Sequence, residues 1–416
     1  MKAPRGTKDI FKPDSYMWQS IEKTIRETSE CFGVGEIRTP TFESTELFLR
    51  GVGEDTDIVN KEMYTFTDKG DRSLTLRPEG TAGVVRAFIE HKLYTEVQPS
   101  KFYYINSTFR YERPQAGRMR EFNQYGVEIF GSDSPMCDAE VISLAHEILR
   151  KLELNNIELK INSMGSTECR EAYNNALKDY LGENLDTLCE NCKVRYEKNP
   201  LRVLDCKSDG CKDIMSKAPS ILEFLTDDCN SHFETVKNIL TEMGIEFIVD
   251  PTIVRGLDYY TGIVFEFISK DIGAQGAICG GGRYDNLVEQ FGGPKMGAVG
   301  FGMGLERLIL ALVKEKGEYN HKPKIDIFVG SIGEKGVLKS HKLVFELRKR
   351  GILAEGDTVG RSVKAQLKYA DKIGAIYSVV LGDDEVESGI VNVKDMQEGT
   401  ITQIKLDEIG KSLFFK

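Results

Sequence analysis

Long apolar segments are missing from this sequence of 416 residues. No apolar run reaches the length that spans a membrane, and the N-terminal stretch MKAPRGTKDIF contains no apolar signal region. We therefore expect neither a membrane protein nor an exported one. The nine cysteines are odd in number and scattered, which is typical of reduced thiols in the cytoplasm.

Basic residues are fewer than acidic ones. The net charge of −10 argues against a protein that coats nucleic acid without specificity. With 40% hydrophobic and 29% charged residues, the composition is typical of a globular protein with a substantial core, and the length suits two or three domains. Internal repeats and low-complexity tracts are absent.

Motifs for covalent catalysis are also missing. The five histidines form no HExxH pattern, and no Ser-His-Asp or Cys-His order is evident. The glycine-rich stretch GFGMGLER lacks the Gly-Lys-Ser/Thr ending of a phosphate-binding loop. We therefore expect a reaction in which no protein side chain serves as the nucleophile.

Hydrophobic periodicity predicts a large N-terminal region and a small C-terminal one. Residues 160–250 are mostly helical in pattern, and the sequence breaks around 322–324. After the break, strands and helices alternate, which predicts a small α/β domain. We place the two domains at 1–323 and 324–416.

Further expected elements are a helix at 14–32 capped by Asp14 or Ser15, a strand, turn and helix at 73–91, a helix at 135–152, a strand at 253–267 and a glycine turn at 280–282.

Two strands, Lys101–Glu112 and Glu121–Phe130, form a predicted hairpin. The connecting loop RPQAGRMR carries three arginines, so it is either simply solvated or a contact for phosphate or nucleic acid. Because strand side chains alternate, Gln124 and Glu128 share one face with Phe122. This face is either the polar floor of a binding site or a solvated surface with cross-strand charge pairs.

Three glycine-containing stretches place polar side chains next to open backbone. In GFGMGLER, Arg307 falls in the first turn of a helix, where it can reach a phosphate held by amide donors. In VRGLDYYTG, Arg255 and two tyrosines lie at the mouth of a strand. The glycines of GFGMGLER and GGGRYDNL are equally compatible with tight turns.

Four cysteines give the spacing C-x2-C-x13-C-x4-C, at Cys189, Cys192, Cys206 and Cys211. The first pair has the spacing of metal ligands and the second pair is looser. A structural zinc knuckle and four reduced thiols both remain open.

Six motifs occur in the order PRGTKDIFKP, LRPEGT, FRYERPQAGRMREFNQYGVEIFG, VRGLDYYTG, GGGRYDNL and GAVGFGMGLERLIL. Together they resemble the class II aminoacyl-tRNA synthetases and, within them, the histidyl-tRNA synthetase family, over essentially the whole chain. The resemblance implies an α+β fold, with an antiparallel sheet core flanked by helices. It also implies a helical insertion at about 165–250 and a C-terminal α/β anticodon-binding domain. The segment ending in Pro40 resembles the first class motif, which forms the dimer interface.

The family makes histidyl-adenylate from L-histidine and ATP with Mg2+, then transfers histidine to the 3′ end of tRNA(His). The substrate's own carboxylate attacks, which agrees with the missing protein nucleophile. The resemblance implies that Arg110 bridges this carboxylate and the α-phosphate, and that Arg255 approaches the phosphate from the other side. Arg307 would bind the γ-phosphate and lie against adenine, opposite Phe122. The implied ATP-binding residues are Arg110, Glu112, Phe122, Gly304 and Arg307; no protein metal ligand is implied.

The resemblance also assigns the amino acid and tRNA contacts. Glu79, Thr81 and Gln124 would hold the α-amino group. The imidazole would be read by Glu128 and Tyr260, in a pocket lined by Tyr259 and Tyr284. The tRNA acceptor end would face Arg113, Gln115 and Arg120.

The family assignment further implies a cytoplasmic homodimer. One non-catalytic relative, the histidine-sensing regulatory subunit of ATP phosphoribosyltransferase, shares the core. It usually lacks the C-terminal domain and has lost ATP-contacting positions, whereas this chain has the domain and Arg110, Arg255 and Arg307. A plain RNA-binding module would explain the basic loop but not the tyrosines.

Overall fold

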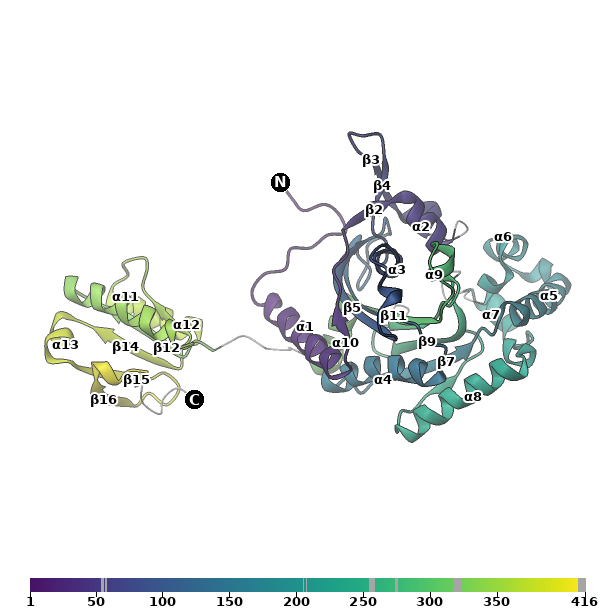
Figure 1. Cartoon of the computed structure of the whole chain (residues 1–416). Coiled ribbons are helices and arrows are strands. Elements are labelled where there is room, and N and C mark those ends of the chain that lie inside the picture. The colour runs from purple at the N-terminus through teal and green to yellow at the C-terminus, as the bar shows by residue number, and fades with distance from the viewer. Residues whose placement is uncertain are drawn as a thin grey trace. The chain divides into compact units, whose positions relative to one another are not determined.

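The computed structural model describes residues 1–53, 56, 58–204, 206, 208–253, 259–273, 276–317 and 324–410. Two compact units make up the chain, Met1–Asn320 and His321–Lys416 (Figure 1). Within the described ranges, no helix combines the length and the apolar character needed to cross a bilayer.

An eight-stranded sheet forms the centre of the first unit, in the order β1-β5-β6-β11-β10-β9-β7-β8 (Figure 1). Neighbouring strands are antiparallel except for the edge pairs β1–β5 and β7–β8. The strands span Gly35–Glu36 (β1), Ser100–Phe109 (β5), Glu121–Phe130 (β6), Ile157–Ser163 (β7), Ile248–Val249 (β8), Thr261–Ser269 (β9), Ala277–Arg283 (β10) and Ala298–Gly304 (β11). The predicted antiparallel core is confirmed.

Helices cover both faces of this sheet. Side chains of β6 alternate, so Tyr125 and Val127 join the larger core, while Gln124, Gly126 and Glu128 point to the other face. The larger core contains α1 (Asp14–Cys31), α4 (Pro135–Lys151), α8 (Asp227–Glu242) and α10 (Leu305–Lys316). The second core contains α3 (Thr81–Glu90) and α9 (Leu287–Gln290). The polar face of β6 therefore lies on the side of α3.

A small sheet and a helical insertion are added to this core. The small sheet has the order β2-β4-β3, with strands Phe42–Ser44 (β2), Tyr64–Thr67 (β3) and Ser73–Leu76 (β4), beside helix α2 (Thr45–Val52) and a π-helix, η1 (Ile58–Glu62). The insertion separates β7 from β8 along the chain. Besides α8 it contains α5 (Thr167–Glu183), η3 (Leu185–Thr187), α6 (Glu190–Lys198), η4 (Pro200–Val203), α7 (Asp209–Met215) and η5 (Ile221–Phe224).

The second unit is a five-stranded mixed sheet in the order β13-β12-β14-β15-β16. Strand β12 pairs in parallel with β13 and β14, and the remaining pairs are antiparallel. Its elements are β12 (Ile327–Ser331), α11 (Glu334–Lys349), β13 (Ala354–Gly356), α12 (Val363–Ile373), β14 (Tyr377–Leu381), α13 (Asp383–Ser388), β15 (Ile390–Asp395) and β16 (Ile401–Lys405). The predicted α/β character of the C-terminal region is confirmed.

The predicted glycine turn at 280–282 is wrong. These glycines lie inside β10, where Gly281 pairs with Phe301 of β11 and with Phe265 of β9. A Cβ on Gly281 would overlap the backbone of Gly300. Glycine is required here because two strands approach closely, rather than because the chain turns.

Three element boundaries also differ from the prediction. Helix α1 begins at Asp14, so Asp14 caps nothing and instead bonds to Lys8 at 2.9 Å. Strand β5 ends at Phe109, which leaves Arg110 in the following loop. Strand β9 begins at Thr261; the earlier part of the predicted strand, 254–258, lies outside the described residues.

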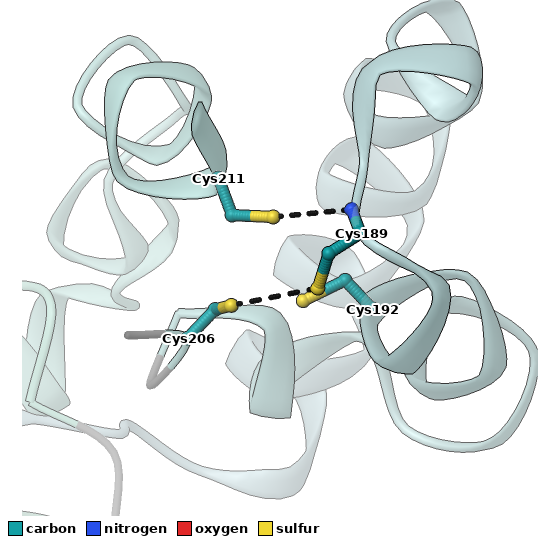
Figure 2. A group of neighbouring side chains, drawn as sticks. All are labelled: Cys189, Cys192, Cys206 and Cys211. Atoms are coloured by element: carbon teal, nitrogen blue, oxygen red, sulfur yellow. Dashed lines mark hydrogen bonds between the residues drawn. The ribbon is translucent and has the colours of Figure 1, made fainter. Parts of the chain in front are cut away.

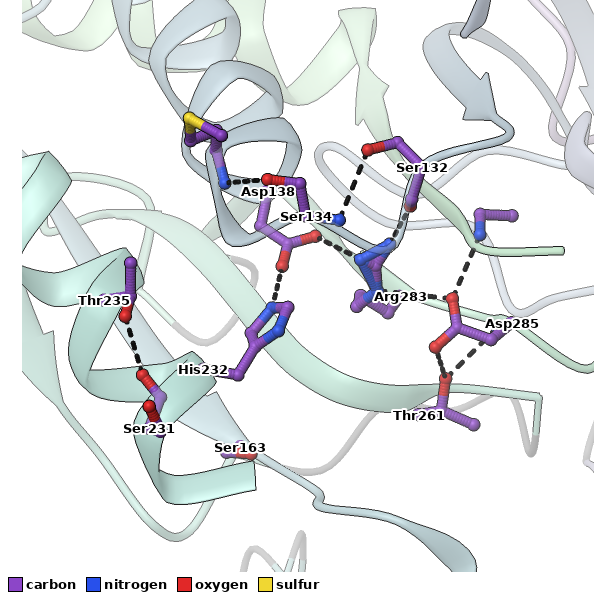
Figure 3. A network of polar contacts seen from close by, with 12 residues as sticks. Ser132, Ser134, Asp138, Ser163, Ser231, His232, Thr235, Thr261, Arg283 and Asp285 are labelled. Carbon is purple, nitrogen blue, oxygen red and sulfur yellow. Dashed lines mark hydrogen bonds and ion pairs between the residues drawn. The ribbon is translucent and has the colours of Figure 1, made fainter. Parts of the chain in front are cut away.

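A buried ionic network ties the insertion to the sheet (Figure 3). Asp138 of α4 is fully buried and accepts from Arg283 Nη1 at 3.2 Å, while its other oxygen lies 2.5 Å from His232 Nε2 of α8. Arg283 also pairs with Asp285 at 3.2 Å, and Asp285 accepts from Thr261 Oγ1 at 3.2 Å. Charges buried in this way stabilise a fold only as long as each keeps its partner.

We expect Asp138→Ala to destabilise the first unit by about 3–5 kcal/mol, because it removes the fully buried counter-charge of the Arg283 guanidinium and leaves the partly exposed Asp285 as its ion-pair partner among the described residues. The matched control is Glu140→Ala on the same helix, whose carboxylate pairs with Lys101 at the surface and whose loss should cost at most about 1 kcal/mol. Urea unfolding midpoints measure both. Equal small shifts in the two variants would contradict the proposed tether.

Candidate active site

A cavity of about 380 Å3 lies over β6, β10 and β11 on the face that carries Gln124. Its lining residues are Arg110, Glu112, Gly117, Arg118, Met119, Phe122, Gln124, Glu266, Ala277, Ile278, Cys279, Gly280, Gly302, Gly304, Glu306 and Arg307. All five residues predicted for ATP binding are among them. Glycines on two neighbouring strands leave the floor of the cavity without side chains, so a flat ligand can approach the backbone.

The two described arginines of the predicted catalytic set are held by backbone oxygens. Arg110 Nε donates to Pro78 O at 2.8 Å, and its guanidinium carbon lies 5.4 Å from the centre of the Phe122 ring. Arg307, in the first turn of α10, donates to Gly117 O at 3.1 Å and to Ala277 O at 2.8 Å. These bonds orient the guanidinium groups in the cavity wall. The third arginine, Arg255, lies outside the described residues.

In the loop after β5, some charged side chains bond to other residues of the same loop. Glu112 is 9% exposed and accepts two bonds from Arg118, one of them at 2.9 Å. Arg120 lies 3.8 Å over the ring of Tyr111 and donates to Glu112 O at 3.1 Å. Of the three residues predicted to face tRNA, Arg113 and Gln115 are exposed, whereas Arg120 is half-buried in these contacts.

A buried carboxyl group, Glu128, lies two same-face positions along β6 from Gln124. It is 1% exposed. Three hydroxyl groups converge on it: Thr81 at 2.7 Å, Tyr104 at 3.2 Å and Tyr284 at a shorter distance. Burial raises its pKa to about 8, although the three hydroxyl donors oppose the shift. The Glu128 carboxyl group is therefore harder to ionise than an exposed one.

Glu79 has a structural function that the sequence did not indicate. Its two carboxylate oxygens accept the backbone N–H groups of Thr81 and Ala82, at 2.7 and 2.8 Å, and so cap the first turn of α3. Burial raises the pKa of Glu79, and the nearby charge of Arg110 acts in the opposite direction. Each carboxylate oxygen retains a second lone pair for a ligand.

Of the remaining predicted histidine contacts, Tyr259 lies close to both of these carboxyl groups. The rings of Tyr259 and Tyr260 lie 4.8 Å apart, and Tyr259 meets Tyr284 edge to face at 5.6 Å. The Oε1 atom of Gln124 is buried and finds no hydrogen-bond partner among the described residues. A buried acceptor of this kind is costly, and it indicates a donor supplied by a ligand.

Sequence reasoning missed two residues of the site. Tyr104 lies opposite Gly126 in the β5–β6 register, and a Cβ on Gly126 or Gly80 would overlap its ring. Glu306 accepts the backbone N–H of Asn123 at 2.9 Å and its amide at 3.0 Å, which joins α10 to β6. The glycines in LRPEGT and NQYGVE were a usable signal for a large neighbouring ring, whereas nothing local indicated Glu306.

Comparisons with known proteins agree with this geometry. The family model described as "Histidyl-tRNA synthetase" matches residues 6–308, and that described as "Anticodon binding domain" matches residues 326–413. The chain is 57% identical to the histidine–tRNA ligases of Caldanaerobacter subterraneus subsp. tengcongensis and of Thermoanaerobacter pseudethanolicus, each over 412 residues and 99% of both chains.

A solved structure, apo histidyl-tRNA synthetase of S. aureus, superposes with a TM-score of 0.84 at 40% identity and covers 99% of each chain. The first family model alone matches well over half of the sequence. Similarity at this level extends from the first motif through the C-terminal unit. The chain therefore belongs to the histidyl-tRNA synthetase family, whose members are aminoacyl-tRNA ligases.

Proposed function

We propose that this chain activates histidine with ATP and transfers it to tRNA(His), using the cavity and the Glu128 pocket as its active centre. The observation that carries the proposal is the buried Glu128 carboxyl group beside a cavity walled by Arg110 and Arg307. A pocket whose carboxyl group can contact an imidazole, next to a cavity walled by cations, fits histidine bound beside ATP. Identity of 57% to ligases over full length disfavours the regulatory-subunit alternative.

Adenylate formation requires the histidine carboxylate to meet the α-phosphate, although both are anions. Arg110 is close enough to Glu79 for its charge to act on that carboxyl group, so it stands between the cavity and the amino acid pocket. We assign it to both anions. Family resemblance gives Arg255 the other side of the phosphate. Arg307 and Phe122 would enclose adenine, and Arg307 would also bind the γ-phosphate, while Gly304 leaves room for the nucleotide.

ATP reaches such a site with Mg2+, which neutralises phosphate charge. The cavity lining contains three carboxyl groups. Glu112 is paired with Arg118, and Glu306 accepts bonds from Asn123. Carboxylate oxygen is a ligand that Mg2+ prefers, so these three side chains would offer it ligand atoms in the wall of the cavity.

The proposed pocket would bind the amino acid at two points, its α-ammonium group and its imidazole ring. Glu79, Thr81 and the unsatisfied oxygen of Gln124 supply acceptors for the α-ammonium group. Glu128 and Tyr260 would contact the imidazole nitrogens, with Tyr259 and Tyr284 as walls. Amino acids that lack a ring nitrogen would add no contact to Glu128 beyond its three hydroxyl partners, and this lost contact is the physical basis of selectivity.

We assign contacts with tRNA and with a second copy of the chain from the exposed residues. Arg113 and Gln115 are open to solvent on the loop after β5, and we assign them to the tRNA acceptor end together with Arg120. Residues 324–416 would bind the anticodon. We also propose a homodimer formed through the segment around Pro40, where Phe42 is 50% exposed and Phe66 is 43% exposed. We also assign the reaction to the cytoplasm.

Histidine-dependent exchange of labelled pyrophosphate into ATP tests the function directly, because it reports adenylate formation without tRNA. We expect exchange with histidine and none when histidine is omitted. A folded protein that binds histidine but catalyses no exchange would be a regulatory subunit.

For Glu128→Gln, we expect the KM for histidine in this assay to rise about 10- to 100-fold. The amide places an N–H donor against hydroxyl groups that already donate to this position. The KM for ATP should change less than about twofold. The matched control, Glu121→Gln at the exposed start of the same strand, should alter neither constant. A parallel rise in both constants of Glu128→Gln would indicate general damage to the sheet.

For Arg110→Ala, we expect the exchange kcat to fall about 100- to 1000-fold, because a charge that stabilises the transition state is lost. Histidine binding measured by calorimetry should weaken far less. The control is Arg150→Ala, which removes an exposed guanidinium from α4 and should leave exchange unchanged. If Arg110→Ala weakens histidine binding as much as it slows turnover, Arg110 is a binding residue.

A further inference from the structure

The cysteines that the ligase reaction does not use gather in the insertion (Figure 2). Four of the nine cysteines fall within residues 189–211. Their sulfur atoms all lie within 4.8 Å of one another. They come from three separate pieces of chain: the start of α6, the segment after η4, and α7. The fold, rather than sequence proximity alone, therefore brings the four thiols together.

We propose that Cys189, Cys192, Cys206 and Cys211 bind one structural zinc ion. A tetrahedral zinc site has Zn–S distances of about 2.3 Å, which places its sulfur atoms about 3.8 Å apart. The Sγ atoms of Cys189 and Cys206 lie 3.8 Å apart. The largest separation in the group exceeds that spacing by only about 1 Å, which side-chain rotation can close.

The surroundings fit a thiolate site. The backbone N–H of Cys189 points at Cys211 Sγ at 3.4 Å, a contact that stabilises a metal-bound thiolate. Four thiolates with one Zn2+ carry a net charge of −2. In the sequence a lysine directly follows Cys192, Cys206 and Cys211. Four protein ligands leave no open position, so the site is structural rather than catalytic.

A bound metal would stabilise this part of the insertion. The elements around the cysteines are short: nine residues in α6, four in η4 and seven in α7. Helices of this length are marginal by themselves. Cys192 and Cys211 are buried against the same apolar core as Tyr173 and Leu177 of α5. Zinc would thus fasten α6 and α7 to each other and onto α5.

Two other states of the thiols are chemically reasonable. A disulfide requires a sulfur separation of about 2.05 Å, far shorter than the 3.8 Å between Cys189 and Cys206. None of the nine cysteines, all of which lie among the described residues, forms a disulfide. An iron ion also accepts four thiolates, so metal identity has to be measured rather than assumed.

The test is metal analysis of the full-length protein purified without chelators. We expect about one zinc per chain in the wild type. Cys206→Ser should weaken zinc binding at least about 100-fold in competition with a chelating dye, since even indirect contacts to a metal site are worth 10- to 100-fold. The matched control is Cys229→Ser, which removes another half-buried thiol from the same insertion and should keep the zinc.

A second measurement does not depend on the variants folding. Titrating metal-free wild-type protein with Co2+ should produce thiolate-to-cobalt charge-transfer bands and the visible bands of a tetrahedral ion, at one equivalent. Zinc retained by Cys206→Ser, stoichiometric iron, a thiol count that shows two disulfides, or nine reactive thiols with no tetrahedral cobalt spectrum would each overturn the proposal. Neither measurement depends on ligase activity.

Discussion

One steric constraint underlies the site. Large polar side chains of the pocket fill space that is open because the residue beside them is a glycine. Tyr104 occupies the space above Gly126 and Gly80, and Glu128 occupies the space above Gly300. Because these glycines carry no Cβ, the phenol and the carboxyl group can meet in the interior. Their hydrogen bond then makes burial of the carboxyl group tolerable. A methyl group at any of these glycines would displace a side chain of the pocket.

The same glycines also shape the cavity. Gly302 leaves room for Gln124, and Gly280 on the next strand continues the bare floor. The walls are charged and the floor is glycine backbone whose polar groups are paired in the sheet, so the electrostatic influence of Arg110 and Arg307 is weakly screened there. One sheet face therefore offers a flat surface for a base, cations for phosphates and, further along β6, a buried acceptor for a ring nitrogen. In the proposed reaction, this arrangement would bring the two substrates together on one strand.

Polar links in and beside the cavity join the surrounding helices to that face. The Asp138 network joins α8 and α4 to β10, and Glu306 joins α10 to β6. The insertion begins directly after β7 and returns through α8, so its own stability bears on the sheet. The cysteine group would supply that stability for its shortest elements. Hydrogen bonds and ion pairs near the active centre, and metal-bound thiolates in the insertion, would thus both hold helices in place.

Some of this was present in the sequence itself. Periodicity located the hairpin, the helix over α4 and the α/β character of the C-terminal unit, because alternation and helical repeats depend on neighbouring residues. The ordered motifs identified the family, and Phe122, Gln124 and Glu128 were correctly expected on one face because the period of a strand is two.

Tertiary structure decided the rest. It placed the three glycines of GGGRYDNL, which were expected in a turn, inside a central strand, because the pairing of β10 with β9 and β11 involves residues distant in sequence. It gave Glu79 a capping function, brought Tyr104 and Glu306 to the site and gathered cysteines from three chain segments. Local pattern specifies which way a side chain points along its own element. Which partner it meets is set by packing between elements, and the roles of these buried polar groups depend on that partner.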